Sequence, residues 1–284
     1  MKMKILLAGY NLDTDVIKAL KRQNPVRADA TPETLSASYA RISRDPRSID
    51  ELRQVARQEV EKARKSNQSI IFKMGHHSVA EHAVFNFDLI GVSRLALEEI
   101  EKFRLCSYTE KSQRYQKLED DFLVPEEIKT AGLEKDFTGA IKLQNGFYRE
   151  LIKKGIEPED ARYITSLGTL GQVGMTLNAR NLELLFRRFA SSPVAEVREI
   201  GREMYALVEP IAPSIILFAK ADDYDQKTYP EIKKAIKGPG GPGKKMKAEV
   251  ELKAYGSEGD DRLIAALIHT STNLSYDDCL KKAK

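Results

Sequence analysis

Apolar side chains recur at helical spacing in three long stretches of the chain. They fall on every third or fourth position, with charged residues between them, over residues 49–63, 137–152 and 194–211. This spacing predicts amphipathic helices, each with one apolar face turned toward a core. The third helix is expected to end near Pro210 and Pro213, because proline lacks the backbone N–H that continues a helix.

Two shorter segments have the pattern of β-strands. Residues 83–90 alternate apolar and polar side chains, and residues 5–9 form a short apolar run after a basic N-terminus. The N-terminal run lacks the long apolar region and cleavage site of a signal peptide, so a first strand is the better prediction. A helix from Ser93 to Phe103 should follow the second strand, with Ser93 as its N-cap. The expected fold class is α+β, with helices in the majority.

A glycine- and proline-rich stretch divides the chain. Residues 237–247 contain six consecutive Gly and Pro residues flanked by lysines, a composition that no helix or central strand tolerates. We therefore expect a body over 1–236, a linker over 237–247 and a C-terminal segment over 248–284. The segment is too short to form an ordinary independent core.

The C-terminal segment weakly resembles the start of the chain. Residues 250–256 echo the first strand, and a gapless alignment then pairs Leu263, Ala265, Ser271, Asp278 and Leu280 with Leu35, Ala37, Ser43, Asp50 and Leu52. Chance similarity between two short units is the alternative. The hypothesis is that 248–284 is the truncated start of a second repeat.

Composition excludes several classes of protein. The 284 residues are 42% apolar, and 46 basic side chains against 42 acidic ones leave a formal charge of +4. No apolar run approaches the ~20 residues of a membrane span, and basic and acidic residues are interleaved, so neither membrane nor nucleic acid is an expected partner. Two cysteines, Cys106 and Cys279, cannot form a disulfide framework, which favours a cytoplasmic protein. Cys106 is expected to be a small buried thiol.

Three of the four histidines lie in residues 76–82. His77, Glu81 and His82 suggest a metal site, but His77 and His82 are five residues apart and diverge on a helix. Ser78 with Glu81 three residues later fits a capping box at a helix start. The capped helix is the preferred interpretation, and no metal site is expected.

Arginine and hydroxyl groups are concentrated in two later parts of the chain. Residues 102–115 hold two arginines, two lysines and three Ser or Thr residues, an inventory that suits a phosphate. Arg162, Arg180 and the pair at 187–188 lie in a mostly apolar stretch, where buried guanidinium groups need anionic partners. Ordinary surface loops and ion pairs with acidic helices remain the alternatives.

In this order and at these separations, the three segments resemble the flavin-dependent thymidylate synthases over roughly residues 35–215. Members of that family have a stretch that contains His and Ser or Thr and ends in Glu-His. A strand and then a helix follow. The helix ends in a signature that begins with Arg-His-Arg and finishes with Ser-x-Arg-Tyr. The matching residues are His76, Ser78, Glu81, His82, Arg104, Ser107, Ser112, Arg114 and Tyr115, followed by Ala161-Arg162 and Asn178-Ala179-Arg180.

The resemblance implies a helix-dominated fold around an antiparallel or mixed sheet, and a homotetramer with active sites at subunit junctions. It implies FAD as cofactor and reductive methylation of dUMP to dTMP, with methylenetetrahydrofolate as carbon donor and NADPH as reductant. The implied catalytic residues are Ser112 and Arg188. The implied flavin-binding residues are Ser78, Glu81, Lys102, Phe103, Arg104, Asn178 and Arg180. The implied substrate-binding residues are Glu99, Glu110, Ser112, Arg114, Arg162 and Arg188.

The signature departs from the family mainly on its flavin side. Lys102 and Phe103 replace the first Arg and the His, Thr109 replaces an Asn, and Glu98-Glu99 replace a His-Gln pair. Lysine is a point charge that cannot reproduce a planar guanidinium fork. The alternative function is therefore a non-catalytic or differently active relative that retains a nucleotide or anion site and a structural oligomeric role.

Overall fold

The computed structural model describes residues 2–22, 30–115, 118, 121–236 and 256–284, and it divides the chain into two compact units, Met1–Ile232 and Lys233–Lys284. The predicted linker at 237–247 and the strand-like residues 250–255 lie outside the described residues. The division into a body, a linker and the start of a second repeat therefore stays a prediction.

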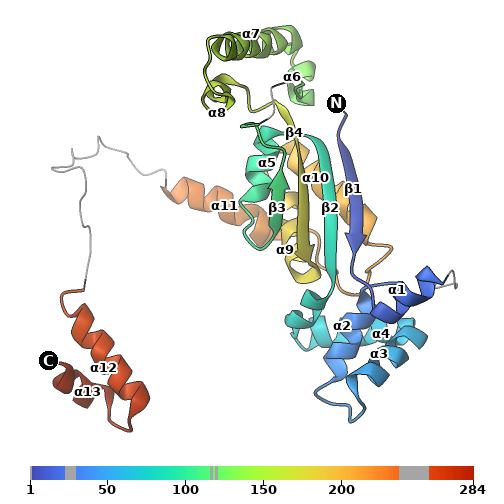
Figure 1. The fold of residues 1–284 in the computed structure, drawn as a ribbon, viewed down its shortest axis with the longest axis vertical. Helices are drawn as coiled ribbons and strands as arrows, with labels where there is room; N and C mark the ends of the chain where they lie inside the picture. The colour runs from blue at the N-terminus through green and yellow to red at the C-terminus, as the bar shows by residue number, and fades with distance from the viewer. Residues whose placement is uncertain (1, 23–29, 116–117, 119–120, 237–255) are drawn as a thin grey trace. The chain divides into compact units, whose positions relative to one another are not determined.

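A four-stranded antiparallel sheet is the centre of the first unit (Figure 1). Its strands are β1 (Lys4–Tyr10), β2 (Val84–Ser93), β3 (Ser107–Glu110) and β4 (Leu170–Asn178), in the order β1-β2-β4-β3. The strands predicted at 5–9 and 83–90 are both present. The α+β class with an antiparallel sheet is thus confirmed.

Three helices cover one face of the sheet: α5 (Arg94–Glu101), α9 (Ala179–Ala190) and α10 (Ala195–Val208). Alternate side chains of β2 and β4 turn toward them and are fully buried, among them Phe85, Phe87 and Met175. This alternation is the pattern that predicted the strand, since successive side chains of a strand point to opposite faces.

Helices also gather at the two ends of the sheet (Figure 1). At one end lie α1 (Thr14–Lys21), α2 (Glu33–Arg41), α3 (Ile49–Gln58), α4 (Val60–Asn67), a π-helical turn (Gln68–Lys73) and a 3-10 helix (His77–His82). At the other end lie α6 (Glu126–Thr130), α7 (Glu134–Lys153), α8 (Pro158–Ala161) and a 3-10 turn (Arg162–Ile164), which we call the helical lobe. Helix α11 (Asp223–Ile236) follows α10 along the chain.

Most helices lie where the local sequence pattern predicts them. Ser93 caps α5 by accepting the backbone N–H of Ala96 at 3.1 Å, as predicted. The helices predicted over 137–152 and 194–211 are α7 and α10. The single helix predicted over 49–63 is wrong: the backbone breaks at Glu59 (φ −120°, ψ 56°), so that α3 and α4 each pack against α2.

The capping box predicted at Ser78 and Glu81 is also wrong. Both residues lie inside the 3-10 helix, which has no side-chain cap, and the Glu81 carboxylate instead accepts from Arg180 Nη1 at 2.5 Å. An ion pair with a residue 99 positions away has displaced the local interaction. Cys106 is half-buried rather than buried, and burial raises the pKa of its thiol, which disfavours a nucleophilic thiolate.

Helix α10 packs closely on α9 at Gly201. A Cβ added there would lie 2.9 Å from the Cβ of Phe189, a buried side chain that has no room to move. We expect Gly201→Ala to lower the free energy of unfolding by roughly 1–3 kcal/mol through overpacking, although alanine favours helices by about 1 kcal/mol. Gly139 in α7 is the control, since a Cβ there meets nothing within 4 Å. Urea denaturation should show Gly139→Ala neutral or stabilised, and an equal effect of the two changes would contradict the close packing.

The second unit contains α12 (Gly259–Ser271) and α13 (Tyr276–Ala283), packed as a hairpin. The paired alanines of the proposed repeat, Ala37 and Ala265, are both fully buried. Ser275 begins α13 and accepts the N–H of Asp278, much as Ser48 precedes α3 with Glu51 three residues on. The two serines are one residue out of register with the gapless alignment. These features agree with the repeat hypothesis, which stays a prediction.

Candidate functional site

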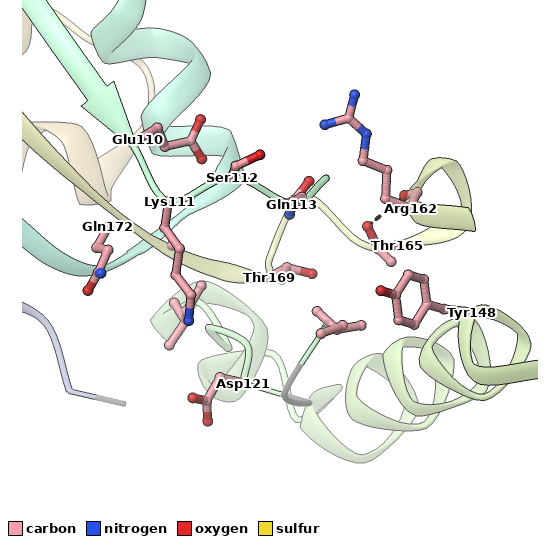
Figure 2. A pocket seen from close by; sticks show the side chains of 13 residues that line it. Glu110, Lys111, Ser112, Gln113, Asp121, Tyr148, Arg162, Thr165, Thr169 and Gln172 are labelled. Atoms are coloured by element: carbon pink, nitrogen blue, oxygen red, sulfur yellow. Dashed lines mark hydrogen bonds between the residues drawn. The ribbon is translucent and has the colours of Figure 1, made fainter. Parts of the chain in front are cut away.

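Two pockets of the first unit contain residues that the sequence singles out. The lobe pocket lies where β3 and β4 meet the helical lobe, and Figure 2 shows it. Its lining residues are Glu110, Lys111, Ser112, Gln113, Leu118, Asp121, Tyr148, Arg162, Thr165, Thr169, Leu170, Gly171 and Gln172. The arginine pocket has a volume of about 530 Å³. Its lining residues are His77, Glu81, Leu105, Arg180, Asn181, Glu183, Leu184 and Arg187.

Short-range geometry fixes Arg162 at the lobe pocket. The backbone leaves α8 in a 3-10 turn, and the Thr165 hydroxyl donates to the Arg162 carbonyl at 2.8 Å. The Arg162 Nε donates to the carbonyl of Glu159 at 3.0 Å. Among the described residues nothing binds the two terminal nitrogens of Arg162, so the outer edge of its guanidinium is available to an anion.

The opposite side of the lobe pocket is formed by strand residues. Glu110 and Gln172 lie there in Figure 2, across from Arg162 and Tyr148. The Glu110 carboxylate is held by Arg94, whose second terminal nitrogen binds Glu98 at 2.7 Å. Gly171 permits this arrangement, because a Cβ there would lie 2.9 Å from Leu97 Cδ1 and 3.6 Å from Glu110 Oε1. The carboxylate that faces the pocket is therefore compensated by a guanidinium within the same unit.

The predicted substrate residues divide between the pocket and its surroundings. Glu110, Ser112 and Arg162 line the lobe pocket together. Arg114 points elsewhere in the single chain and pairs with Glu159 at 2.9 Å, three residues before Arg162. The remaining two lie outside both pockets: Glu99 pairs with Lys102 at 2.5 Å, and the Arg188 guanidinium lies 5.2 Å from the centre of the Phe103 ring.

The predicted flavin residues divide in the same way. Glu81 and Arg180 line the arginine pocket as an ion pair. Asn178 caps α9 by accepting the N–H of Asn181 at 3.0 Å. Neither Asn178 nor the other four line the pocket: Ser78, Lys102 and Arg104 are exposed, and Phe103 is only 3% exposed within the core.

Several lining residues were not predicted from sequence. Tyr148, Thr165, Thr169 and Gln172 join the lobe pocket, and Tyr148 had counted only as an apolar position of a helix. Asn181 joins the arginine pocket, as do His77, which the sequence suggested only for a metal site, and Arg187, which it suggested only as one of four arginines in an apolar stretch. Of the adjacent arginines at 187 and 188, it is Arg187 that reaches this pocket. Its Nε is buried with no hydrogen-bond partner among the described residues, while another of its nitrogens lies 4.0 Å from Asp225.

Two other features are absent from the part of the chain that the structure describes. No group of three or more His, Cys, Asp or Glu side chains there is placed to hold a metal ion. No helix there has the length and apolar character to cross a membrane.

An α+β unit whose two pockets present guanidinium groups has the chemistry that suits a phosphorylated ligand. Sequence comparison gives the family. Residues 26–214 match the family described as Thy1, thymidylate synthase complementing protein, and the chain belongs to this family. The resemblance seen in the sequence is thereby confirmed.

Individual relatives have names related to that description. A protein of Geobacter sulfurreducens named flavin-dependent thymidylate synthase is 33% identical over 193 residues, which are 65% of this chain and 80% of the relative. The protein of that name from Pyrococcus abyssi is also 33% identical, over 147 residues. That match covers 49% of this chain and 60% of the relative, so the chain spans less than two thirds of that protein.

Solved structures show the same fold. PolB from Streptomyces cacaoi, a UMP/dUMP methylase bound with 5-Br dUMP, gives a TM-score of 0.60 at 15% identity, over 75% of this chain and 93% of that one. The flavin-dependent thymidylate synthase ThyX from Helicobacter pylori, complexed with FAD and dUMP, gives a TM-score of 0.53 at 16% identity. The match covers 76% of this chain and 99% of that one. At these identities the likeness establishes the fold alone.

Proposed function

We propose that this protein is a flavin-dependent thymidylate synthase that methylates dUMP to dTMP, with methylenetetrahydrofolate as carbon donor and NADPH as reductant. The observation that carries the proposal is the lobe pocket, where Arg162, Ser112 and Glu110 converge from segments that match the family. A guanidinium with an open edge suits a phosphate, and hydroxyl and amide groups suit the rest of a nucleotide.

The residues of this chain take the following parts in that proposal. Arg162 binds the phosphate of dUMP, and Arg114 approaches the same phosphate from the loop that also carries Ser112. Ser112 lies near the reacting pyrimidine, and Arg94 keeps the Glu110 carboxylate in place beside the nucleotide. Arg188, which lies on the face of Phe103 and outside the lobe pocket of the single chain, is proposed to contact the pyrimidine in an active site completed at a subunit junction.

The arginine pocket is the proposed site of FAD. Two arginines, an asparagine and a histidine line a space of about 530 Å³. Glu81 and Glu183 also line it, but Arg180 binds the first carboxylate, and the backbone N–H groups of Leu217 and Phe218 bind the second. The buried Nε of Arg187 has no partner among the described residues and is a donor that a phosphate oxygen would satisfy. These residues fit the pyrophosphate part of the cofactor. A bound flavin supplies the redox chemistry that reduces the transferred carbon. Arg180, Arg187 and Asn181 bind and orient it.

The alternative function is a non-catalytic or differently active relative that keeps the nucleotide site. Two observations favour it. Lys102 is engaged by Glu99, and Phe103 is buried in the core, so neither side chain lies at the arginine pocket. Both replace polar residues that the family signature places on its flavin side.

Flavin uptake separates the two functions. We expect purified protein with added FAD to show flavin absorbance after desalting, and Arg180→Ala to lower FAD affinity roughly tenfold, since a hydrogen bond to a charged group contributes about 1.5–3 kcal/mol. Arg202→Ala is the matched control, because Arg202 is an exposed arginine of α10 that pairs with Glu199 away from both pockets. A colourless protein that binds dUMP would support the alternative.

The oligomer and the tail belong to the same proposal. A homotetramer in the cytoplasm, with active sites completed at subunit junctions, agrees with Arg114 lying outside the lobe pocket of the single chain. Light scattering measures the mass directly. Limited proteolysis within 238–245 should release the tail and leave the 1–236 body folded, whereas unfolding of the body would contradict the repeat hypothesis.

A further inference from the structure

Two buried residues of the lobe pocket carry hydroxyl groups that no described residue binds. Thr169 and Tyr148 are each only 3% exposed, and both line the pocket. The Oγ1 of Thr169 is buried with no hydrogen-bond partner among the described residues. The Tyr148 side chain lines the same pocket, and no described residue forms a hydrogen bond with its hydroxyl. A buried hydroxyl without a partner costs about 1–3 kcal/mol, and the hydroxyl of a buried tyrosine is usually bound. Such groups point to a ligand that satisfies them.

The position of the two hydroxyls relative to Arg162 suggests which part of the ligand they bind. Helix α7, which carries Tyr148, packs against the turn that begins at Arg162. Thr169 closes the next turn, its N–H donating to the Ser166 carbonyl at 3.0 Å. Figure 2 shows Thr169 between the lobe side of the pocket and the strand side, where Glu110 and Gln172 lie. If Arg162 binds the phosphate, the hydroxyls lie next to it and the strand residues lie beyond.

A nucleotide has its parts in the same order, with the sugar between phosphate and base. A sugar hydroxyl both donates and accepts, and so do the side chains of Tyr and Thr. A base carbonyl only accepts, and a phosphate prefers charged donors. Arg162, Tyr148 with Thr169, and Gln172 all line this one pocket, so a phosphate, a sugar and a base can each find a suitable group there.

Resting on the proposed function, we propose that Tyr148 and Thr169 bind the 3′-hydroxyl of the nucleotide sugar and make the site selective for nucleotides that carry it. Arg162 binds the phosphate, and the two side-chain hydroxyls form hydrogen bonds with the sugar. They are binding residues of the substrate, additional to those that match the family signature.

Calorimetric titration of the full chain tests this with three probes: dUMP, 2′,3′-dideoxyuridine monophosphate and inorganic phosphate. We expect Tyr148→Phe and Thr169→Val each to lower the affinity for dUMP roughly three- to tenfold, which is the effect of losing one neutral hydrogen bond. Affinity for the dideoxy nucleotide and for phosphate should stay as in the parent. Tyr163→Phe is the control, since Tyr163 follows Arg162 but is 84% exposed.

Unfolding midpoints exclude a purely structural role. Removing an unpartnered buried hydroxyl should leave the midpoint of the ligand-free protein unchanged or raised. Unchanged dUMP affinity in both variants overturns the inference and leaves the proposed function standing. Equal losses of affinity for all three probes, or a lowered unfolding midpoint of the ligand-free variant, also overturn the inference, because they indicate a packing role. A parent protein that binds phosphate but no dUMP refutes the proposed function itself, and the inference with it.

Discussion

Arg162→Ala is expected to weaken dUMP binding by about 1.5–3 kcal/mol, a loss of roughly 10- to 150-fold, because a hydrogen bond to a charged group contributes that much. The terminal nitrogens of Arg162 have no partner among the described residues, so the loss falls on the ligand rather than on the fold. Titration calorimetry at fixed ionic strength measures it. Arg162→Lys should recover only part of the affinity, since an ammonium group cannot bind two phosphate oxygens as a planar fork does.

Arg114→Ala is the informative comparison. The resemblance assigns Arg114 to the same phosphate, and the expected loss is again about 1.5–3 kcal/mol. In the single chain, however, Arg114 pairs with Glu159. Unchanged affinity in Arg114→Ala would show that its role is to bind the helical lobe. Unchanged affinity in Arg162→Ala would mean that the phosphate lies elsewhere.

Glu33→Ala is expected to lower the free energy of unfolding by about 3–5 kcal/mol, the cost of removing one partner from a buried ion pair. Glu33 is fully buried, and its carboxylate accepts from Arg64 Nε and from both the N–H and the hydroxyl of Ser214, each at 2.6 Å. These bonds join α2 and α4 to the segment that follows α10. Without the carboxylate, the Ser214 N–H loses its buried acceptor.

The other partner of Arg64 provides the control. Glu61 binds Arg64 at 2.8 Å, but its side chain is 79% exposed, so solvent replaces the interaction when it is lost. Glu61→Ala should change stability by no more than about 0.5 kcal/mol. Urea midpoints with unchanged m-values separate the two variants. A loss below 1 kcal/mol in Glu33→Ala would show that the buried network contributes little.

The sequence by itself determined the elements whose signals are local. The periodicity of residues 137–152 and 194–211 predicted helices α7 and α10, and the alternation of 83–90 predicted β2. Ser93 was identified as an N-cap because capping involves a hydroxyl and a backbone N–H only three residues apart. The family signature identified Ser112 and the downstream Ala-Arg element identified Arg162, and the fold brings both into one pocket.

Only the tertiary structure decided which polar groups meet across the chain. Glu81 and Ser78 had the spacing of a capping box, yet Arg180 took the carboxylate. The burial of Glu33 depends on Ser214, which is 181 residues away. Tyr148 had the spacing of a core residue, and only the packing of α7 beside Arg162 placed its hydroxyl in a pocket. Periodicity and capping depend on neighbours within one helical turn, whereas the partner of a charge or a hydroxyl is set by how distant segments pack, and no spacing in the sequence records that.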